Sequence, residues 1–265
     1  MEWVAAPIGT TPSADALHHA DFVFHLASTT LPSTSNESIS YDLESNLVAT
    51  VQTLEAAVSA GVRRLVFVSS GGTVYGIARQ VPISETHPTD PICSHGIQKL
   101  SIEKYLYLFR SMKGLDSIIL RVSNMYGESQ DCSKPVGAVA HFAAKASNRM
   151  PLEIWGDGTT TRDYVHVDDV VKALMISAEY DGAERVFNIG TGRGTSLAQL
   201  VDLLRERTPW PVAVNYGAAR GFDVPENVLD VGRARSELLW TPEVTLERGL
   251  DRVVQRAQTR LAPCI

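Results

Sequence analysis

Two side chains in one short segment could move a proton. His95 and Lys99 stand four positions apart in the stretch CSHGIQK, and residues at that spacing share one face of a helix. Histidine exchanges a proton near neutral pH, and a neighbouring ammonium lowers the pKa of an imidazole and keeps it neutral. The pair could be a catalytic couple, a damaged version of one, or two unrelated polar residues.

The elements around this segment are those of an α/β fold. Helical apolar spacing predicts helices over 38–61 and about 94–113. Short apolar runs predict strands over 20–28, 63–72 and 116–124. These strands are apolar throughout, which is typical of a parallel sheet covered on both faces.

The second half of the chain continues the alternation with shorter elements. Helices are expected over 137–148, 166–180, 196–206 and 246–261, and strands over 152–158, 185–190 and 211–217. A domain boundary near residue 130 is expected, with elements that cross it.

Composition argues against several classes of protein. The chain has 265 residues and a formal net charge of -6. It lacks a basic stripe, so a nucleic-acid partner is not expected. No apolar run suggests a membrane span or a signal peptide. Cys93, Cys132 and Cys264 lack metal-type spacing and are expected to be free thiols in a reducing cytoplasm.

A glycine-rich turn follows the predicted strand 185–190. Gly190, Gly192 and Gly194 precede a predicted helix, but Thr195 stands where the dinucleotide fingerprint G-x-G-x-x-G has its third glycine. The next predicted strand has no acid at its end to bind a ribose. We therefore expect a tight strand-to-helix turn here, not a phosphate-binding loop.

A second group of residues could suggest a metal site. His166, Asp168 and Asp169 are residue types that bind metals. Adjacent acids point in different directions on a helix, and the helix dipole favours acids in the first turn. We expect an ordinary helix N-terminus and no metal.

Several stretches together resemble one family. They are DFVFHLAS, NLVATVQTLEAA, LVFVSSGGTVYG, PISETHPTDPICSHGIQKLSIEKYL, LRVSNMYG, IWGDGTTTRDYVHVDDVVKA, FNIGTG and RGFDVPENVLDVGRARSELLWTP. From about residue 20 to about residue 250, the chain is similar to the extended short-chain dehydrogenase/reductases. The resemblance is strongest to NAD-dependent sugar-nucleotide epimerases and dehydratases of the UDP-glucose 4-epimerase type.

The resemblance implies an architecture and partners. It implies a Rossmann-like parallel sheet over 1–130, to which later segments return, and a smaller α/β nucleotide-sugar domain over 131–265. Similar proteins begin with a strand, a glycine-rich turn and a helix that bind the NAD pyrophosphate, and the match begins after them. We therefore expect an N-terminally truncated sheet. The resemblance also implies NAD as the cofactor and a UDP-sugar as the substrate. It further implies a cytoplasmic homodimer formed through helices 42–60 and 95–112.

The implied reaction oxidises a sugar hydroxyl by hydride transfer to NAD and reduces the ketone on its other face. The family carries Tyr-x-x-x-Lys at its site; here Lys99 is in place and His95 fills the tyrosine position. A neutral imidazole needs no activation, but it is shorter than a phenol and would reach a hydroxyl only through a water. Gly71 occupies the usual Ser/Thr position, so Ser70 or Thr73 would orient the hydroxyl.

Further residues follow from the matching motifs. Those implied on the nicotinamide side are His25, Leu26, Ala27, Asn46 and Ser69, together with Lys99. Those implied on the nucleotide sugar are Asn124, Trp155, Arg162, Arg220 and Asp223, where the arginine forks suit a diphosphate. Two alternatives to an active enzyme stay open: a family member that binds a nucleotide sugar without turnover, and a gene fragment.

Overall fold

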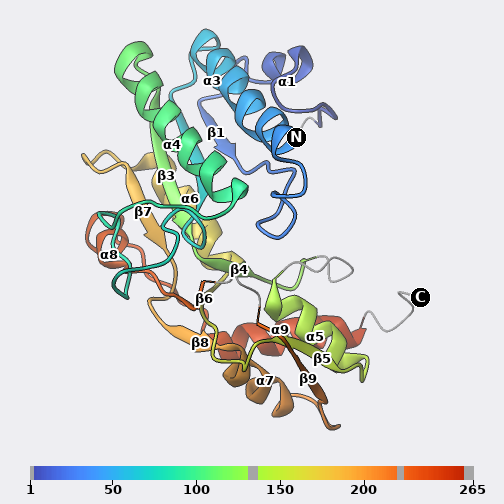
Figure 1. Cartoon of the computed structure of the whole chain (residues 1–265). Helices are drawn as coiled ribbons and strands as arrows, with labels where there is room; N and C mark the ends of the chain where they lie inside the picture. The colour runs from blue at the N-terminus through green and yellow to red at the C-terminus, as the bar shows by residue number, and fades with distance from the viewer. Residues whose placement is uncertain (1–2, 131–136, 220–223, 260–265) are drawn as a thin grey trace. The chain divides into compact units, whose positions relative to one another are not determined.

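The chain divides into two compact units. The computed structural model describes residues 3–130, 137–219 and 224–259 (Figure 1). The first unit comprises Met1–Gly76, Glu85–Val122 and Leu174–Asn188, and the second comprises Ile77–Ser84, Ser123–Ala173 and Ile189–Ile265. The functions expected for the two sides of residue 130 stay predictions. Among the described residues, the helices are too short or too polar to cross a membrane.

A four-stranded sheet forms the centre of the first unit. Its strands are β1 (Phe22–His25), β2 (Arg64–Ser70), β3 (Asp116–Val122) and β7 (Val186–Ile189), in the order β1-β2-β3-β7. The pairings of β1 with β2 and of β2 with β3 are parallel. This confirms the α/β fold with a parallel sheet that the apolar strands predicted.

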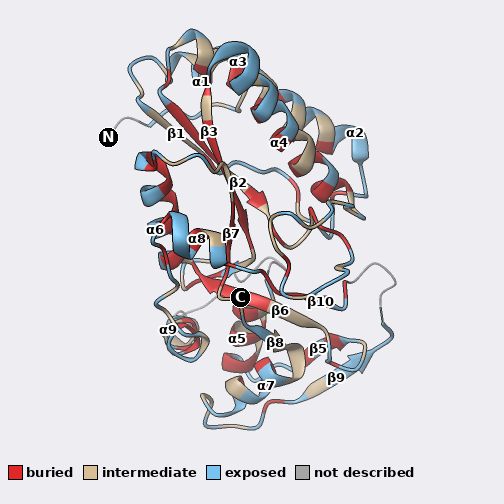
Figure 2. Ribbon diagram, turned by 90° about the vertical axis from the view of Figure 1, so that its left-hand side faces the viewer, coloured by how far each residue is buried: buried red, intermediate tan, exposed pale blue. Residues whose placement is uncertain are grey.

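Helices cover the sheet of the first unit. They are α1 (Thr11–Asp15), α2 (Ile39–Asp42), the π-helical turn η1 (Leu43–Val48), α3 (Ala49–Ser59) and α4 (Ser94–Lys113). Figure 2 shows α3 and α4 side by side along the strands, with buried residues between them. Leu54, Phe67 and Leu106 are fully buried there. The single helix expected over 38–61 is thus interrupted by a π turn.

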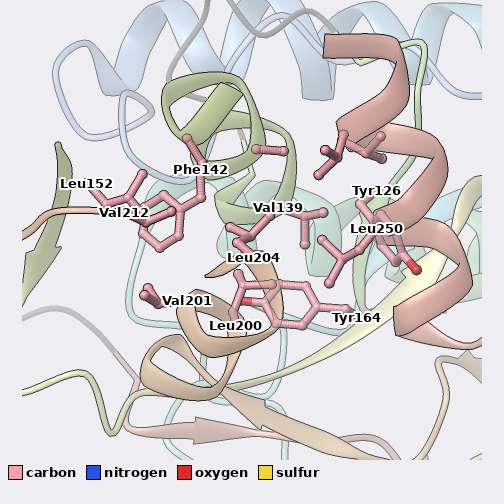
Figure 3. Close-up of a cluster of buried hydrophobic side chains, with 14 of the residues drawn as sticks. Tyr126, Val139, Phe142, Leu152, Tyr164, Leu200, Val201, Leu204, Val212 and Leu250 are labelled. Carbon is pink, nitrogen blue, oxygen red and sulfur yellow. The ribbon is translucent and has the colours of Figure 1, made fainter. Parts of the chain in front are cut away.

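The second unit has its own sheets and core. Its strands are β4 (Asn124–Tyr126), β5 (Leu152–Trp155), β6 (Thr161–His166), β8 (Gly194–Ser196), β9 (Val214–Gly217) and β10 (Glu226–Asn227). Its helices are α5 (Ala138–Ser147), α7 (Leu197–Arg205), α8 (Gly232–Glu237) and α9 (Leu246–Thr259), with the start of α6 (Val167–Glu179). One sheet has the order β10-β6-β4, with β8 also on β6, and β5 pairs with β9. Figure 3 shows the apolar cluster of this unit, to which α5, α7 and α9 and the strands β4, β5 and β6 contribute side chains.

Two expected strands have different limits. The run 116–124 breaks at Ser123, whose N–H donates to the Ile189 carbonyl at 2.9 Å. As a result β3 pairs with β2, while β4 pairs with β6 in a separate sheet. The strand expected over 152–158 ends at Trp155. Beyond it the chain turns, because Gly156 and Gly158 both have a φ of 85°, a value that suits only glycine well.

The glycine-rich turn after β7 is tight, as expected. Gly192 has a φ of 71°, and Asp163 of β6 accepts the backbone N–H groups of Thr191 at 2.8 Å and Gly192 at 3.1 Å. A phosphate-binding loop would direct such N–H groups at its ligand. Here they bond to a carboxylate of the same chain.

Candidate active site

The site is centred on the first turns of α4 in the first unit. His95 and Lys99 are 8% and 5% exposed. The Lys99 Nζ donates to the carbonyl of Val68 at 3.0 Å and lies 4.8 Å from the centre of the Phe67 ring. Burial lowers the pKa of Lys99 to about 8, although nearby carboxylates oppose this shift. At neutral pH the ammonium is therefore still charged, close to the point where it loses its proton.

His95 is neutral at physiological pH. Burial, and then the charge of Lys99, lower the pKa of this imidazole to about 4. Its Nδ1 is buried and has no hydrogen-bond partner among the described residues. Because a buried polar atom normally has a partner, this nitrogen is suited to bond a ligand or a water.

Tyr75 is the tyrosine near the site that could be considered a substitute base. Its hydroxyl donates to Asn188 Oδ1 at 2.6 Å and accepts from Arg121 Nη1 at 3.0 Å. Burial raises the pKa of Tyr75 to about 12. Tyr75 is therefore held as a neutral phenol and does not replace the base that would stand at position 95.

The turn after β2 contacts the first turn of α4. Gly71 donates its N–H to the carbonyl of Val122 at 2.8 Å. A Cβ at Gly96 would lie 2.8 Å from the Thr73 carbonyl oxygen, so glycine is needed for this contact. The Thr73 hydroxyl is buried without a partner in the described part of the chain. Ser70 lies half-buried at the end of β2. Of the two residues, Thr73 is the one whose backbone contacts the turn that contains His95.

The expected cofactor residues divide into two groups. Three polar side chains bond inside the protein: His25 Nε2 to Thr50 Oγ1 at 2.9 Å, Asn46 Oδ1 to the Thr29 N–H at 2.9 Å, and Ser69 Oγ to Glu103 Oε1 at 2.5 Å. His25 also stacks on Phe67, beside Lys99. Burial, and then Lys99, lower the pKa of His25 to about 4.

The second group consists of two exposed residues and the buried Lys99, which has unused N–H groups. Leu26 is 57% exposed, and Ala27 is exposed beside it at the end of β1. Lys99 donates one hydrogen bond to the protein, and an ammonium has three N–H groups to donate. The nicotinamide riboside half that the resemblance implies here would meet exposed apolar side chains at Leu26 and Ala27 and an ammonium donor at Lys99.

The expected nucleotide-sugar residues lie in the second unit. Asn124 of β4 pairs with Tyr164 of β6. Arg162 lies two residues before Tyr164, so Asn124 and Arg162 share one face of the sheet. The Asn124 Nδ2 is buried and lacks a partner among the described residues. Trp155 is half exposed at the end of β5, whereas Arg220 and Asp223 lie outside the described residues.

The acids that suggested a metal have other partners. Asp168 and Asp169 stand in the first turn of α6. Asp168 pairs with Arg252 at 2.8 Å, and Asp169 accepts the backbone N–H groups of Glu243 and Val244, each at 3.0 Å. His166 bonds to Glu128 at 3.2 Å. Asp169 therefore holds the loop before α9, a role that its position in the sequence did not reveal.

The structure adds charged residues that the sequence patterns missed. Arg121 of β3 and Glu103 of α4 form a buried ion pair at 2.6 Å beneath Ser69. Asp42 at the end of α2 is fully buried and bonds to Ser94, next to His95. The spacing of Glu103 four residues after Lys99 was a usable signal, because it places both on one face of α4.

Comparison with known proteins identifies the family. The model of the NAD dependent epimerase/dehydratase family matches residues 11–190. The chain belongs to this family. Among curated relatives of the epimerase/dehydratase chain is a dTDP-4-dehydro-6-deoxyglucose reductase from Escherichia coli, which is 36% identical over 90% of this chain and 75% of its own length.

Solved structures of family members have the same fold. The UDP-glucose 4-epimerase of Thermotoga maritima, solved with UDP-glucose, is 39% identical, with a TM-score of 0.90 over 93% of this chain and 80% of the other. The Thermus thermophilus UDP-glucose 4-epimerase complex with NAD is 27% identical, with a TM-score of 0.88 over 96% and 83%. This agreement confirms the Rossmann-like α/β fold of the epimerase/dehydratase chain.

Proposed function

We propose that this epimerase/dehydratase acts on a UDP-sugar with NAD, as a 4-epimerase that oxidises a sugar hydroxyl and reduces the ketone on its other face. The observation that carries the proposal is the pair of buried residues at the family's Tyr-x-x-x-Lys position. His95 is neutral there, and Lys99 keeps its charge at neutral pH. The Thermotoga protein, solved with UDP-glucose, supports the choice of nucleotide.

The residues of the first unit would handle the proton. NAD, when bound, supplies the hydride acceptor and donor. His95 Nδ1, a buried nitrogen without a partner in the described part, would take the hydroxyl proton through one water and later return it. The Thr73 hydroxyl would orient that water or the sugar, and Lys99 would stabilise the developing oxyanion. Asn124 and Arg162 would bind the diphosphate.

The decisive experiment is turnover by the full chain supplied with NAD. UDP-glucose, UDP-N-acetylglucosamine and UDP-glucuronic acid are each incubated, and the 4-epimer is measured by chromatography. A parallel arm offers a dTDP-4-keto-6-deoxy sugar with NADH, because one relative is a reductase. Lys99→Met is expected to lose at least about 100-fold in rate, whereas Lys104→Met, an exposed lysine of the same helix, keeps it. Product from the reductase arm alone would replace epimerase by reductase.

A second candidate is a protein that binds a nucleotide sugar without turnover. It is favoured by His95, whose imidazole is shorter than a phenol, and by Gly71 in the usual Ser/Thr position. This candidate predicts a thermal shift with UDP-sugars and no product in any arm. If neither a UDP-sugar nor NAD(H) binds, both functions are wrong for this chain.

We also infer a cytoplasmic homodimer formed through α4. Ile97, Tyr105, Leu108 and Met112 lie on one face of this helix, and each is between 38% and 68% exposed. Monomeric proteins rarely expose a continuous apolar stripe of this kind. A second copy, presenting the same stripe, is the proposed partner.

A further inference from the structure

The start of α4 is held by residues from another part of the first unit. The N-cap residue Cys93 makes no side-chain cap in the described structure. The backbone N–H of Ser94 donates to Asn36 Oδ1 at 2.9 Å, and that of His95 donates to Ser35 Oγ at 3.0 Å. Helix N-termini need such acceptors because their first N–H groups have none within the helix. The turn that contains His95 is thus fixed by the segment that follows β1.

Asp42 connects this turn to α2. Its side chain is fully buried. Oδ2 accepts the Ser94 hydroxyl at 2.6 Å, and Oδ1 accepts Asn46 Nδ2 at 3.0 Å and the Thr30 hydroxyl. A buried carboxylate without such donors would be strongly destabilising. Three donors from three segments therefore converge on one acid.

Asn46 extends the connection back to the loop after β1. Its Oδ1 accepts the Thr29 N–H at 2.9 Å, while its Nδ2 donates to Asp42. The loop, the end of α2 with η1, and the first turn of α4 are consequently joined by one set of hydrogen bonds. Asp42 lies at its centre.

The charge of Asp42 also acts on both proton-handling residues. It opposes the effect of burial on the pKa of Lys99 and of His95, and so raises both values. The other ionisable groups that interact with Lys99 are Glu103 on α4, His25 on β1 and His95 itself. Of the two carboxylates, Glu103 is already paired with Arg121.

We propose that Asp42 is a positioning residue of the His95–Lys99 site: through its hydrogen bonds to Ser94, Asn46 and Thr30 it holds the first turn of α4 against the loop after β1. Its effect on turnover rests on the proposed function. Its effect on Lys99 does not, because that can be measured without substrate or NAD.

The first test is the titration of Lys99 in the full chain. Its side-chain ¹³Cε resonance, assigned with Lys99→Met, is followed by NMR from acid to alkaline pH in the wild type and in Asp42→Asn. We expect its pKa to fall by about one unit or more in the variant. The matched control is Asp169→Asn, an equally buried acid of the second unit that accepts two backbone N–H groups, and it should leave Lys99 unchanged.

The second test measures kcat and KM, and it applies if the wild type turns over a nucleotide sugar. Asp42→Asn should move the alkaline limb of kcat to lower pH by the same amount, with KM changed less than twofold. Ser94→Ala, which removes one hydrogen bond to Asp42, should lower kcat about tenfold, and Ser94→Thr should restore it. If Asp42→Asn does not fold, the Ser94 pair alone decides the proposal.

Two results would overturn the positioning role. One is a Lys99 titration that is the same in Asp42→Asn as in the wild type, with only a loss of thermal stability like that of Asp169→Asn. The other is a Ser94→Ala variant with wild-type kcat. A wild type that converts no nucleotide sugar would refute the proposed function, while the NMR titration would still decide the effect of Asp42 on Lys99.

Discussion

The two ionisable residues of α4 lead to an unusual pH dependence. An ordinary histidine titrates near pH 6.5, but the pKa of His95 is lowered to about 4 and that of Lys99 to about 8. Above pH 5 His95 is already deprotonated, so the rate should not change as pH rises through 6.5. It should fall above about pH 8, where Lys99 loses its proton. A pH–kcat profile with an acid limb near 6.5 would contradict this assignment.

Restoring the family's tyrosine tests whether residue 95 limits the rate. With NAD present, His95→Tyr should raise kcat about tenfold or more, because a phenol reaches the sugar hydroxyl directly and Lys99 can stabilise the phenolate. His95→Phe is the matched control: it has the ring but lacks a proton acceptor, and it should be inactive. If His95→Tyr brings no gain while NAD is bound, residue 95 is not what limits this protein.

At the scale of elements, α4 contains a buried amide side chain that does not suit its surroundings. Gln98 is fully buried, and neither its Oε1 nor its Nε2 has a partner within the described part of the chain. An unsatisfied buried polar group costs about 1–3 kcal/mol. Gln98→Met, which has a similar shape, should therefore increase the free energy of unfolding by about 1 kcal/mol or more. Chemical denaturation measures this, with the exposed Gln255→Met as the control; an equal or lower stability would show that Gln98 has a partner.

The elements differ in how well the sequence predicted them. The range expected for α4 is almost that observed, because its apolar spacing and the terminating Gly114 are local signals. β6 was missed because Arg162, Asp163 and His166 interrupt its apolar pattern, although Asp163 and His166 are buried. Their polar groups bond to segments distant in sequence, which no window of local residues reveals.

The candidate site, like the elements, could be predicted from the sequence only in part. His95 and Lys99 could be found from their spacing and the surrounding motifs. Asp42 could not be found in this way, because its role depends on Ser94, which lies more than 50 residues later in the chain and meets it only in the folded first unit. The π turn that places Asn46 was also missed, since it has no recognised sequence signal.

For the whole molecule, the exposed stripe on α4 predicts the state of assembly. The wild type should be a dimer in light scattering, and Leu108→Glu should give a monomer, because a charge buried in the interface would be unpaired. Tyr107→Glu is the matched control: Tyr107 is 74% exposed on a different face of the same helix and should leave the dimer intact. A wild type that stays monomeric at high concentration would refute this interface.

The π turn of η1 also determines where the first unit can change in length. Hydrogen bonds of the i→i+5 type enclose one more residue than those of an α-helix, so Leu43–Val48 holds an additional residue. Deleting one residue there could restore α geometry while Leu54 and Ala57 of α3 keep their buried positions. Because the π turn already takes up the additional residue, the residues before it would keep their orientation relative to α3, and Asp42 would stay next to Ser94. A one-residue deletion in this turn that spares Asn46 would therefore preserve both the core and the site, whereas a deletion within α3 would rotate the preceding residues by about 100° and separate Asp42 from Ser94.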